Sequence, residues 1–308
     1  MLIKRFILLA GLLLGVTFAN AAPRVVVFAD DSATGREMNQ KLLDELRQAG
    51  FSEAAMVSVS IGQKTLPGDT PASTGELAIA VGAQALSHVL NRTMARQVIA
   101  VMLTRTGLDE VVAGQPSRAG RDIYAVLLDQ PLARYLNLIR LALPQCQRVG
   151  VLFSEATGGQ LKNLERLAAE RNLSISAAWI LDDATFILRL DHLLSQSDVL
   201  LALPDARVHN RNTVQPLLLT TYRVGIPVVA YSEAYKQAGA LVSLYSTPAQ
   251  LARQVAEIAW SLSQGRPVMR YQTPRDFSVG VNDTVARSLG LSILAGETLR
   301  ERLKQMPD

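Results

Sequence analysis

The feature that most constrains the fold is the stretch from Asp198 to Tyr245. Val214 to Tyr222 repeats apolar side chains at helical spacing, and Gly225 ends this predicted helix. Strands that helices cover on both faces need apolar runs without polar alternation. This order of elements predicts a βαβ unit, in which a parallel sheet lies between layers of helices. The three runs that predict such strands are Asp198–Leu203, Pro227–Tyr231 and Ala240–Tyr245.

The same alternation of strand and helix fills the rest of the chain in two successive series. The second series begins with Arg148–Phe153, which repeats the character of the first strand, Arg24–Phe28. Two series of similar length predict an α/β protein of two Rossmann-like lobes with parallel sheets, rather than one long sheet. Gly107–Gly120 is expected to be a loop with at most one short turn of helix. The remaining predicted strands are Ala54–Ile61, Leu77–Val81, Gln97–Leu103, Asp122–Leu128, Ser174–Leu181 and Phe277–Val281.

Two helix starts can be predicted from capping residues. Thr34 and Glu37 have the spacing of a capping box at the start of the first helix. The run Thr247-Pro248-Ala249-Gln250 has a capping threonine, a proline at the first helical position and a glutamine at the third. A helix is therefore expected to begin at Pro248.

The first 21 residues have the composition of a secretory signal peptide. Lys4-Arg5 gives a positive start, Phe6–Phe18 is apolar, and Ala19–Ala21 is a cleavage site of small residues. The alternative is an uncleaved anchor, but the apolar run is shorter than the ~20 residues that span a bilayer. Export and cleavage are therefore predicted. No cysteine at the cleavage site could carry a lipid, so the mature protein is expected in the periplasm without a membrane anchor.

The net charge limits the kinds of binding partner, and the cysteine content limits disulfide formation and thiol chemistry. Of 31 basic residues, 29 remain without Lys4 and Arg5, against 27 acidic residues, which is a net charge of +2. This small excess argues against nucleic acid or an anionic membrane as a partner. Cys146 is the only cysteine, so the chain cannot form an intrachain disulfide, and it has no neighbouring base that would make it reactive.

The sequence offers no constellation typical of an enzyme. His88, His192 and His209 have neither each other nor an acidic residue at metal-ligand spacing. The chain has no G-x-S-x-G elbow, P-loop or G-x-G-x-x-G. His209 follows a predicted strand and could reach a cleft, whereas Gly158-Gly159 is interpreted as a plain turn rather than an anion site. We therefore expect no catalytic residues, no metal and no cofactor.

Polar and aromatic residues do follow the predicted strands, at the edge where a parallel sheet binds its ligands. Each carboxylate there could bind a ligand ammonium, act in an acid–base pair, or cap the next helix. For Asp205 binding is favoured over capping, because it follows a strand in the middle of the sheet. Tyr231 and Tyr245 could stack on a ligand or pack in the core. The carboxylates in question are Asp30, Asp31, Asp205 and Glu233.

From about Leu77 to Leu291 the chain resembles the ABC-transporter substrate-binding proteins, in the group with tryptophan- and tyrosine-binding components. This group belongs to the type I periplasmic binding-protein fold. No single motif carries the resemblance; the order and spacing of several segments do. They are VGAQAL at Val81–Leu86, QPLARYLNLIRLALPQCQRVGVLFS at Gln130–Ser154, DVLLALPD at Asp198–Asp205, GIPVVAYSEAYKQAGALVS at Gly225–Ser243, RQVAEIAWSLSQGRPV at Arg253–Val268 and VNDTVARSLGL at Val281–Leu291.

The resemblance implies two lobes joined by three crossing segments, near Leu128, Ala240–Tyr245 and Phe277–Val281. The first lobe would comprise residues 22–128 and 241–276, and the second residues 129–240 and 277–308. A small ligand would lie between the lobes, and hinge closure would report its presence. The resemblance places Gly82, Ala83 and Gln84 in the first-lobe binding loop, and Ser154, Asp205, Tyr231 and Ser232 at second-lobe cleft positions.

Two functions follow from this resemblance. The first is a periplasmic protein that captures a small polar or amino-acid-like ligand for an ABC permease. The second is a sensory module of the same fold that signals to a membrane receptor or another protein. Two departures from the family pattern favour the second: Leu103–Gly107 replaces an acidic-proline element, and Ala29–Ala33 lacks the usual polar, histidine-containing run. An enzyme ranks third.

Overall fold

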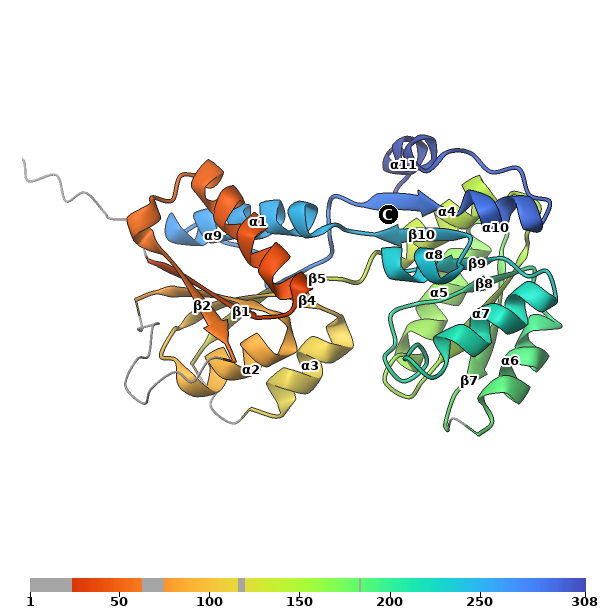
Figure 1. The fold of residues 1–308 in the computed structure, drawn as a ribbon, viewed down its shortest axis with the longest axis horizontal. Helices are drawn as coiled ribbons and strands as arrows, with labels where there is room; N and C mark the ends of the chain where they lie inside the picture. Colours follow the sequence, from red (N-terminus) through yellow and green to blue (C-terminus); the bar gives the residue numbers. More distant parts are fainter. Residues whose placement is uncertain (1–23, 63–74, 116–119, 183) are drawn as a thin grey trace, which may run out of the picture.

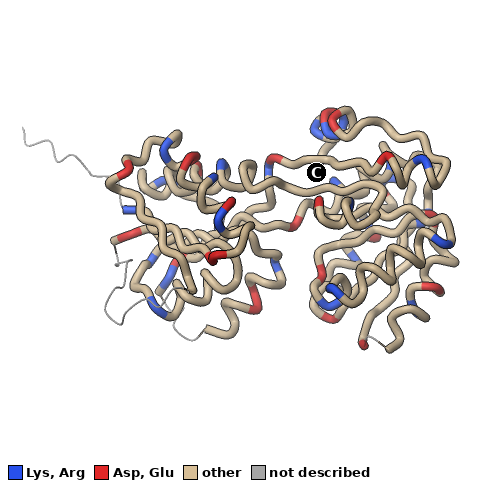
Figure 2. Tube along the Cα trace, viewed as in Figure 1, with Lys and Arg blue, Asp and Glu red and all other residues tan. Residues whose placement is uncertain are grey.

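The structure is a computed structural model that describes residues 24–62, 75–115, 120–182 and 184–308. The predicted signal peptide, residues 1–21, lies outside the described residues. The chain forms two lobes, each built on one six-stranded sheet with helices on both faces (Figure 1). No helix in the described part of the chain is both long and apolar enough to cross a membrane. Basic and acidic residues are interspersed along the chain in both lobes (Figure 2).

The sheet of the first lobe is parallel and has the order β11-β5-β4-β3-β1-β2. Helices α1 (Ala33–Ala49) and α9 (Pro248–Ser263) cover one face. Helices α2 (Gly82–Arg92) and α3 (Arg105–Ala113) cover the other. The strands are β1 (Val25–Asp30), β2 (Met56–Ile61), β3 (Leu77–Val81), β4 (Gln97–Leu103), β5 (Asp122–Leu127) and β11 (Tyr271–Gln272).

The sheet of the second lobe has the order β12-β10-β9-β8-β6-β7. Its strands are parallel except β12, which runs antiparallel to β10. Helices α4 (Leu132–Ala142), α5 (Leu161–Ala169), α10 (Asp283–Ser288) and α11 (Gly296–Lys304) pack on one face, and α6 (Phe186–Leu194), α7 (Val214–Arg223) and α8 (Glu233–Ala238) on the other. Its strands are β6 (Arg148–Phe153), β7 (Ser174–Trp179), β8 (Val199–Leu201), β9 (Val228–Ala230), β10 (Val242–Tyr245) and β12 (Ser278–Val281).

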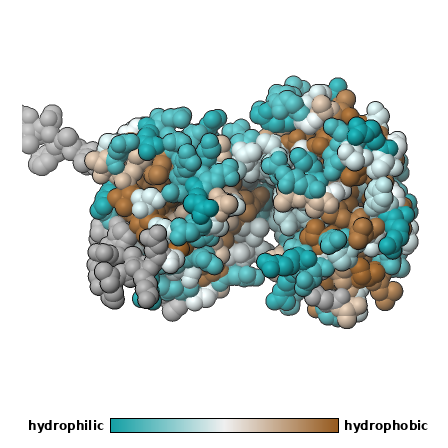
Figure 3. All heavy atoms as spheres, in the orientation of Figure 1, coloured by the Kyte–Doolittle hydropathy of each residue, from teal (hydrophilic) through white to brown (hydrophobic). Residues whose placement is uncertain are grey.

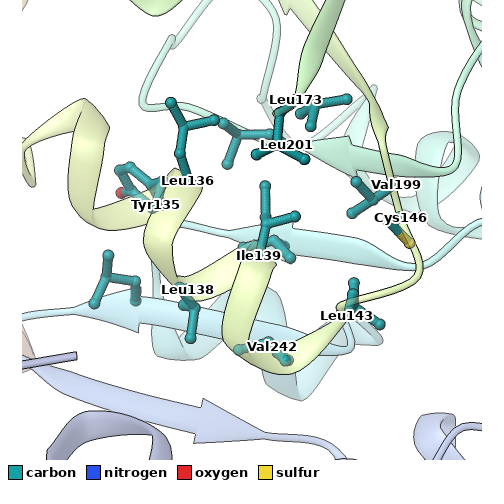
Figure 4. Close-up of a cluster of buried hydrophobic side chains, with 14 of the residues drawn as sticks. Tyr135, Leu136, Leu138, Ile139, Leu143, Cys146, Leu173, Val199, Leu201 and Val242 are labelled. Atoms are coloured by element: carbon teal, nitrogen blue, oxygen red, sulfur yellow. The ribbon is translucent and has the colours of Figure 1, made fainter. Parts of the chain in front are cut away.

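The core of the second lobe shows why uninterrupted apolar runs predicted its strands. Side chains of α4 pack against β8 and β10 between helix and sheet (Figure 4). The other sides of the same strands pack on α6, α7 and α8. Because both faces are covered, every residue of β8 and β9 is buried. The βαβ prediction for Asp198–Tyr245 is confirmed, with the order β8-α7-β9-α8-β10.

The capping predictions had different outcomes. At the start of α9 the Thr247 side chain accepts from the Gln250 N–H, and the Gln250 side chain accepts from the Thr247 N–H at 2.8 Å, so this capping box is confirmed. At the start of α1 the prediction was wrong. Ser32, not Thr34, caps this helix by accepting from the Gly35 N–H.

Three elements differ from the sequence prediction. Gly107–Gly120 was expected to be a loop, but α3 runs through Ala113 because the Thr104 side chain accepts from the Gly107 N–H and caps it. The short strand β11 and the helix α11 were not predicted. Each depends on a distant partner: β11 extends the first sheet beside β5, and α11 packs against β12 and α4.

The path of the chain between the lobes corrects the predicted boundaries. Ala240–Tyr245 was expected to cross between lobes and 241–276 to belong to the first lobe, but β10 is a strand of the second sheet. Phe277–Val281 was likewise expected to cross, yet β12 pairs with β10. The crossings are residues 128–131, 246–247 and 273–277. The first of them agrees with the expectation near Leu128.

Candidate functional site

The candidate site lies where the carboxyl ends of the parallel strands face the opposite lobe. In the second lobe, β6, β8 and β9 lead to Ser154, Asp205 and Tyr231. In the first lobe, β1 ends at Asp30 and β3 leads to Gly82. Figure 1 shows the start of α1 on the side of the first lobe that faces the second, and Figure 3 shows the two lobes side by side in the same orientation. This edge is where an open α/β sheet binds its ligand.

Asp205 is the most heavily bonded side chain of this edge. Its Oδ2 accepts from the Ser154 N–H at 3.0 Å and from the Thr157 hydroxyl. Its Oδ1 accepts from the N–H groups of Arg207 at 3.0 Å and Val208 at 3.2 Å. A carboxylate has about four acceptor positions, so protein donors already occupy them. Asp205 therefore joins the loop after β6 to the loop after β8.

These contacts change the role that the sequence predicted for Asp205. The side chain is only 5% exposed. Burial by itself would raise the pKa of Asp205, but the hydrogen bonds from Thr157 and Ser154 outweigh burial and lower the pKa. The carboxylate is therefore ionised and saturated. The prediction that it takes a ligand ammonium is replaced by a structural role, close to the capping alternative.

The loop that Asp205 holds carries His209 into an aromatic cluster. His209 is 7% exposed, and its Nδ1 is hydrogen-bonded to the Tyr235 hydroxyl at 3.0 Å. The His209 ring lies 5.9 Å from the ring of Tyr231 and 5.5 Å from that of Tyr235, centroid to centroid. Burial lowers the pKa of His209 to about 4, although the Asp205 charge opposes this. The imidazole is therefore neutral at physiological pH.

Tyr231 is the member of this cluster that reaches the surface, because it is half-buried at the end of β9. Burial, and then the charge of Asp205, raise its pKa. Among the described residues, three buried side-chain atoms have no hydrogen-bond partner: Tyr135 Oη, His209 Nε2 and Ser243 Oγ. One of these atoms belongs to a ring packed on Tyr231. His209 Nε2, beside Tyr231, therefore has no hydrogen-bond partner among the described residues.

The two predicted serines have local structural roles. Ser154 is 1% exposed, and its hydroxyl accepts from the Ala156 N–H at 3.3 Å. Ser232 is half-buried, and its hydroxyl accepts from the Tyr235 N–H at 3.2 Å, which caps α8. Both serines therefore shape the edge on which Tyr231 lies.

The carboxylates of the first-lobe edge bond to residues that are nearer in the sequence than the partners of Asp205 in the loop after β6. Asp30 is half-buried, and its Oδ1 accepts from the Ser32 N–H at 3.1 Å and from the Ser32 hydroxyl. Asp31 accepts from the Ser60 hydroxyl. Asp30 thus supports the residue that caps α1, and the bonds described for it leave its Oδ2 unused.

Gly82, Ala83 and Gln84 form the first turn of α2. No side chain caps this turn, because the N-cap residue is Val81. Gly82 has a φ of +82°, which a residue with a side chain rarely adopts, and open space surrounds it. Ala83 and Gln84 are exposed and line a shallow groove along α2 with Ser87 and His88. Within the described residues no side chain caps the first N–H groups of α2, which have no partner inside the helix and so can meet an anion.

Arg105 and Asp129 are residues of the first-lobe edge that the sequence analysis missed. The Arg105 guanidinium lies 4.6 Å from the Tyr271 ring centroid and is hydrogen-bonded to Asp109, while the Arg105 N–H donates to Asp129 Oδ2 at 2.7 Å. Burial raises the pKa of Asp129. The only sequence signal was the position of each residue two places beyond the end of a strand, β4 or β5. Tyr271 belongs to β11, which had no strand signal of its own.

Two other candidates have structural explanations. A Cβ on Gly158 would lie 1.9 Å from the Trp179 ring. The glycine at this position therefore allows the chain to pack closely against Trp179, which is a structural role. Cys146 is buried, and burial raises the pKa of its thiol to about 11. Across the described residues, no three His, Cys, Asp or Glu side chains gather as metal ligands would.

Solved structures share this two-lobed fold. A substrate-binding protein with adhesive properties from Clostridium difficile, in its ligand-free, open form, is 16% identical, with a TM-score of 0.67 over 90% of this chain and 97% of its own. A conserved domain protein from Vibrio cholerae is 19% identical, with a TM-score of 0.60 over 91% and 98%. An ABC domain from Streptococcus pneumonia in complex with L-Trp is 15% identical, with a TM-score of 0.58 over 90% and 97%.

The fold and the edge between the lobes define a periplasmic binding protein of type I. The sequence family described as ABC transporter substrate binding protein matches residues 76–303, and the chain belongs to this family. No curated protein sequence matches the chain. The family and the fold are those of substrate-binding proteins, which agrees with the resemblance noted from the sequence.

Proposed function

We propose that this protein captures a small polar or amino-acid-like solute between its lobes in the periplasm and delivers it to an ABC permease. The observation that carries the proposal is the half-buried Tyr231, held at the end of β9 by His209, Tyr235 and the Asp205-bonded loop. A ring fixed in this way offers a flat apolar surface at the edge that faces the first lobe.

The polar part of the ligand would meet the first lobe. A ligand carboxylate would accept hydrogen bonds from the free N–H groups at Gly82, Ala83 and Gln84. A ligand ammonium would bind Oδ2 of Asp30, which the bonds to Ser32 leave unused. Ser154, Asp205 and Ser232 would keep Tyr231 in place without touching the ligand.

Location and partners follow from residues 1–21 and from the family. Cleavage of the predicted signal peptide would release a periplasmic protein without a lipid anchor. The ABC permease is the membrane partner that the family implies. The nearly balanced charge of the mature chain gives no basis for binding nucleic acid.

The test is thermal unfolding of the mature protein against a panel of amino acids, amines, nucleosides and small acids. A ligand at a hundred times its dissociation constant adds about 2.7 kcal/mol to the free energy of unfolding. We expect one class of compound to do this. Tyr231→Ala should weaken that ligand about tenfold or more, which corresponds to about 1.4 kcal/mol of binding free energy.

Tyr222→Ala is the matched control, because Tyr222 is an exposed tyrosine near the end of α7, on the same lobe. Its ligand affinity should equal that of the wild type. Equal affinity of Tyr231→Ala and wild type would remove Tyr231 from the site. No stabilising compound in the whole panel would contradict capture of a small solute.

A sensory module of the same fold is the second candidate, and the first-lobe edge favours it. Arg105 stands where the family has an acidic-proline element, and its guanidinium is committed to Tyr271 and Asp109. A pull-down from a membrane extract separates the two candidates. An ABC permease as the specific partner supports transport, whereas a receptor kinase or cyclase supports sensing.

A further inference from the structure

The three crossing segments are tied together by one network of buried and partly buried hydrogen bonds. The Gln130 amide donates to the Ser246 hydroxyl at 2.8 Å, and this hydroxyl donates to the Asp276 carbonyl at 2.6 Å. One residue from each crossing therefore takes part in a single chain of hydrogen bonds. Gln130 is only 4% exposed, so water competes little for these bonds.

Arg134 lies at the centre of this network. Its Nη1 donates to Gln130 Oε1 at 2.6 Å and to the Pro274 carbonyl at 3.0 Å. Its other nitrogens bind both carboxylate oxygens of Asp308, and the guanidinium lies 4.4 Å from the Phe277 ring centroid. Arg134 is 5% exposed. Only the forked guanidinium can serve all these partners together, because its donors have a fixed planar arrangement.

The third crossing, residues 273–277, is held alternately from the two lobes. Gln254 of α9, in the first lobe, donates to the Thr273 carbonyl at 3.2 Å and accepts from the Arg275 N–H at 3.0 Å. Arg134, in the second lobe, donates to the carbonyl of Pro274, the residue between Thr273 and Arg275. Asp276 and Phe277 then bond to Ser246 and to Arg300 of α11. Figure 1 shows the chain end, where Asp308 lies, beside these crossings.

We propose that Arg134 is a positioning residue for ligand capture, which holds the three crossings as one bundle and so fixes the axis about which the lobes close. The inference rests on the proposed function. Within residues 273–275, Gln254 of the first lobe bonds Thr273 and Arg275, and Arg134 of the second lobe bonds Pro274 between them. The lobes therefore rotate as rigid bodies about this point, and Arg134 sets the relative position of Tyr231 and Gly82 without touching the ligand.

The test measures the distance between the lobes without any ligand. Spin labels at Lys41→Cys on α1 and Glu165→Cys on α5, both exposed positions, report this distance by pulsed electron paramagnetic resonance. The buried Cys146, with its raised pKa, stays unlabelled. Arg134→Lys keeps the positive charge but removes the planar guanidinium, whose donors bond several partners at once. We expect it to widen the interlobe distance distribution and shift its maximum.

Two controls distinguish a change in the relative position of the lobes from a general loss of rigidity within a lobe. Arg121→Lys changes an arginine that, like Arg134, bonds several partners, but these are the backbone carbonyls of Val89, Thr93 and Ala95 within one lobe. It should leave the interlobe distribution unchanged. A second label pair inside the first lobe, Lys41→Cys with Asn91→Cys, should give the same distribution with and without Arg134→Lys.

Ser246→Ala provides an independent variant if Arg134→Lys does not fold, since it removes two links of the network at a half-buried position. It should also widen the interlobe distribution. An unchanged distribution in a folded Arg134→Lys or Ser246→Ala protein overturns the inference. Since no ligand is present, a failed ligand screen leaves this result intact, and a ligand found beside an unchanged distribution refutes only the role of Arg134.

Discussion

The two lobes present differently built edges to each other. In the second lobe, buried residues that follow three strands are hydrogen-bonded in one network. Asp205 accepts from Ser154 and Thr157, the His209 N–H donates to the Asp205 carbonyl at 2.8 Å, and the His209 ring is bonded to Tyr235. In the first lobe the hydrogen bonds of the edge are exposed, as in Asp30 with Ser32, Asp31 with Ser60 and Arg105 with Asp109. The second-lobe edge is therefore a buried network, whereas the first-lobe edge consists of smaller, exposed groups of contacts.

This difference shows which lobe is pre-organised. A fully bonded, buried polar network fixes its geometry, because breaking one member leaves other groups unsatisfied in a poorly hydrated interior. Exposed pairs are exchanged for water at little cost. The second lobe therefore offers a preset wall around Tyr231, and the first lobe offers groups that can adjust. The first lobe is also where the sequence departs from the family pattern.

The largest expected effect tests this contrast directly. Asp205→Ala would leave the buried Val208 N–H and the Thr157 hydroxyl without an acceptor. It would also remove one acceptor from the Ser154 N–H, which keeps a bond to Thr157, and the acceptor of the partly buried Arg207 N–H. We expect the free energy of unfolding to fall by about 4 kcal/mol, measured by urea denaturation at pH 7. The first-lobe counterpart Asp30→Ala, at a half-buried position, should cost about 1 kcal/mol or less. Equal losses would mean that the lobes are not built differently.

The second prediction concerns His209 and the dependence of stability on pH. Its folded pKa of about 4 lies below the unfolded value of about 6.5. The unfolded chain therefore binds the proton more readily, and stability is lost as pH falls from 6.5 through 4. The loss should reach about 3 kcal/mol. Denaturation series at pH 7 and pH 4.5 measure most of it.

His209→Gln should remove this part of the pH dependence, whatever it does to stability at pH 7. The matched control His192→Gln changes an exposed histidine on α6 and should keep the wild-type slope. A slope in His209→Gln equal to that of the wild type would show that His209 is accessible to protons, which contradicts its place in the buried cluster.

The smallest of the three effects tests how tightly the second-lobe loops pack. Gly158→Ala places a methyl group against the Trp179 ring, whereas a Cβ on the adjacent Gly159 meets nothing within 4 Å. Overpacking of this kind costs about 2 kcal/mol, so the melting temperature of Gly158→Ala should fall well below that of Gly159→Ala. Indistinguishable melting temperatures would mean that Trp179 moves aside freely.

Much of the fold could be predicted from the sequence because its signals are local. The apolar runs of β3, β4 and β6 marked strands with the bounds that the structure has. The capping residues at Thr247–Gln250 marked the start of α9. By contrast, β11 has two residues, and it forms only because β5 offers a free edge. The antiparallel direction of β12 likewise depends on where the third crossing re-enters the second lobe.

The candidate site was predictable by position but not by role. The strand ends marked Asp205 and Tyr231 as residues of the sheet edge, and the family resemblance added Ser154, which follows β6. Nothing local to Asp205 shows that its four acceptor positions are filled, since Ser154 and Thr157 lie about fifty residues away in the chain, 51 and 48 positions respectively. The partner of His209, Tyr235, lies 26 positions along the chain, and for this reason its burial was missed.

The sequence by itself determined the two α/β lobes and most of their strands, because hydrophobic periodicity and capping act over a few residues. The order and spacing of several segments indicated the family. The tertiary structure decided which polar groups are saturated and which remain free. It also decided where the lobes are joined, since Gln130, Ser246 and Asp276 meet only after both sheets have formed. Hydrogen-bond satisfaction depends on distance in space, and the linear sequence does not contain that distance.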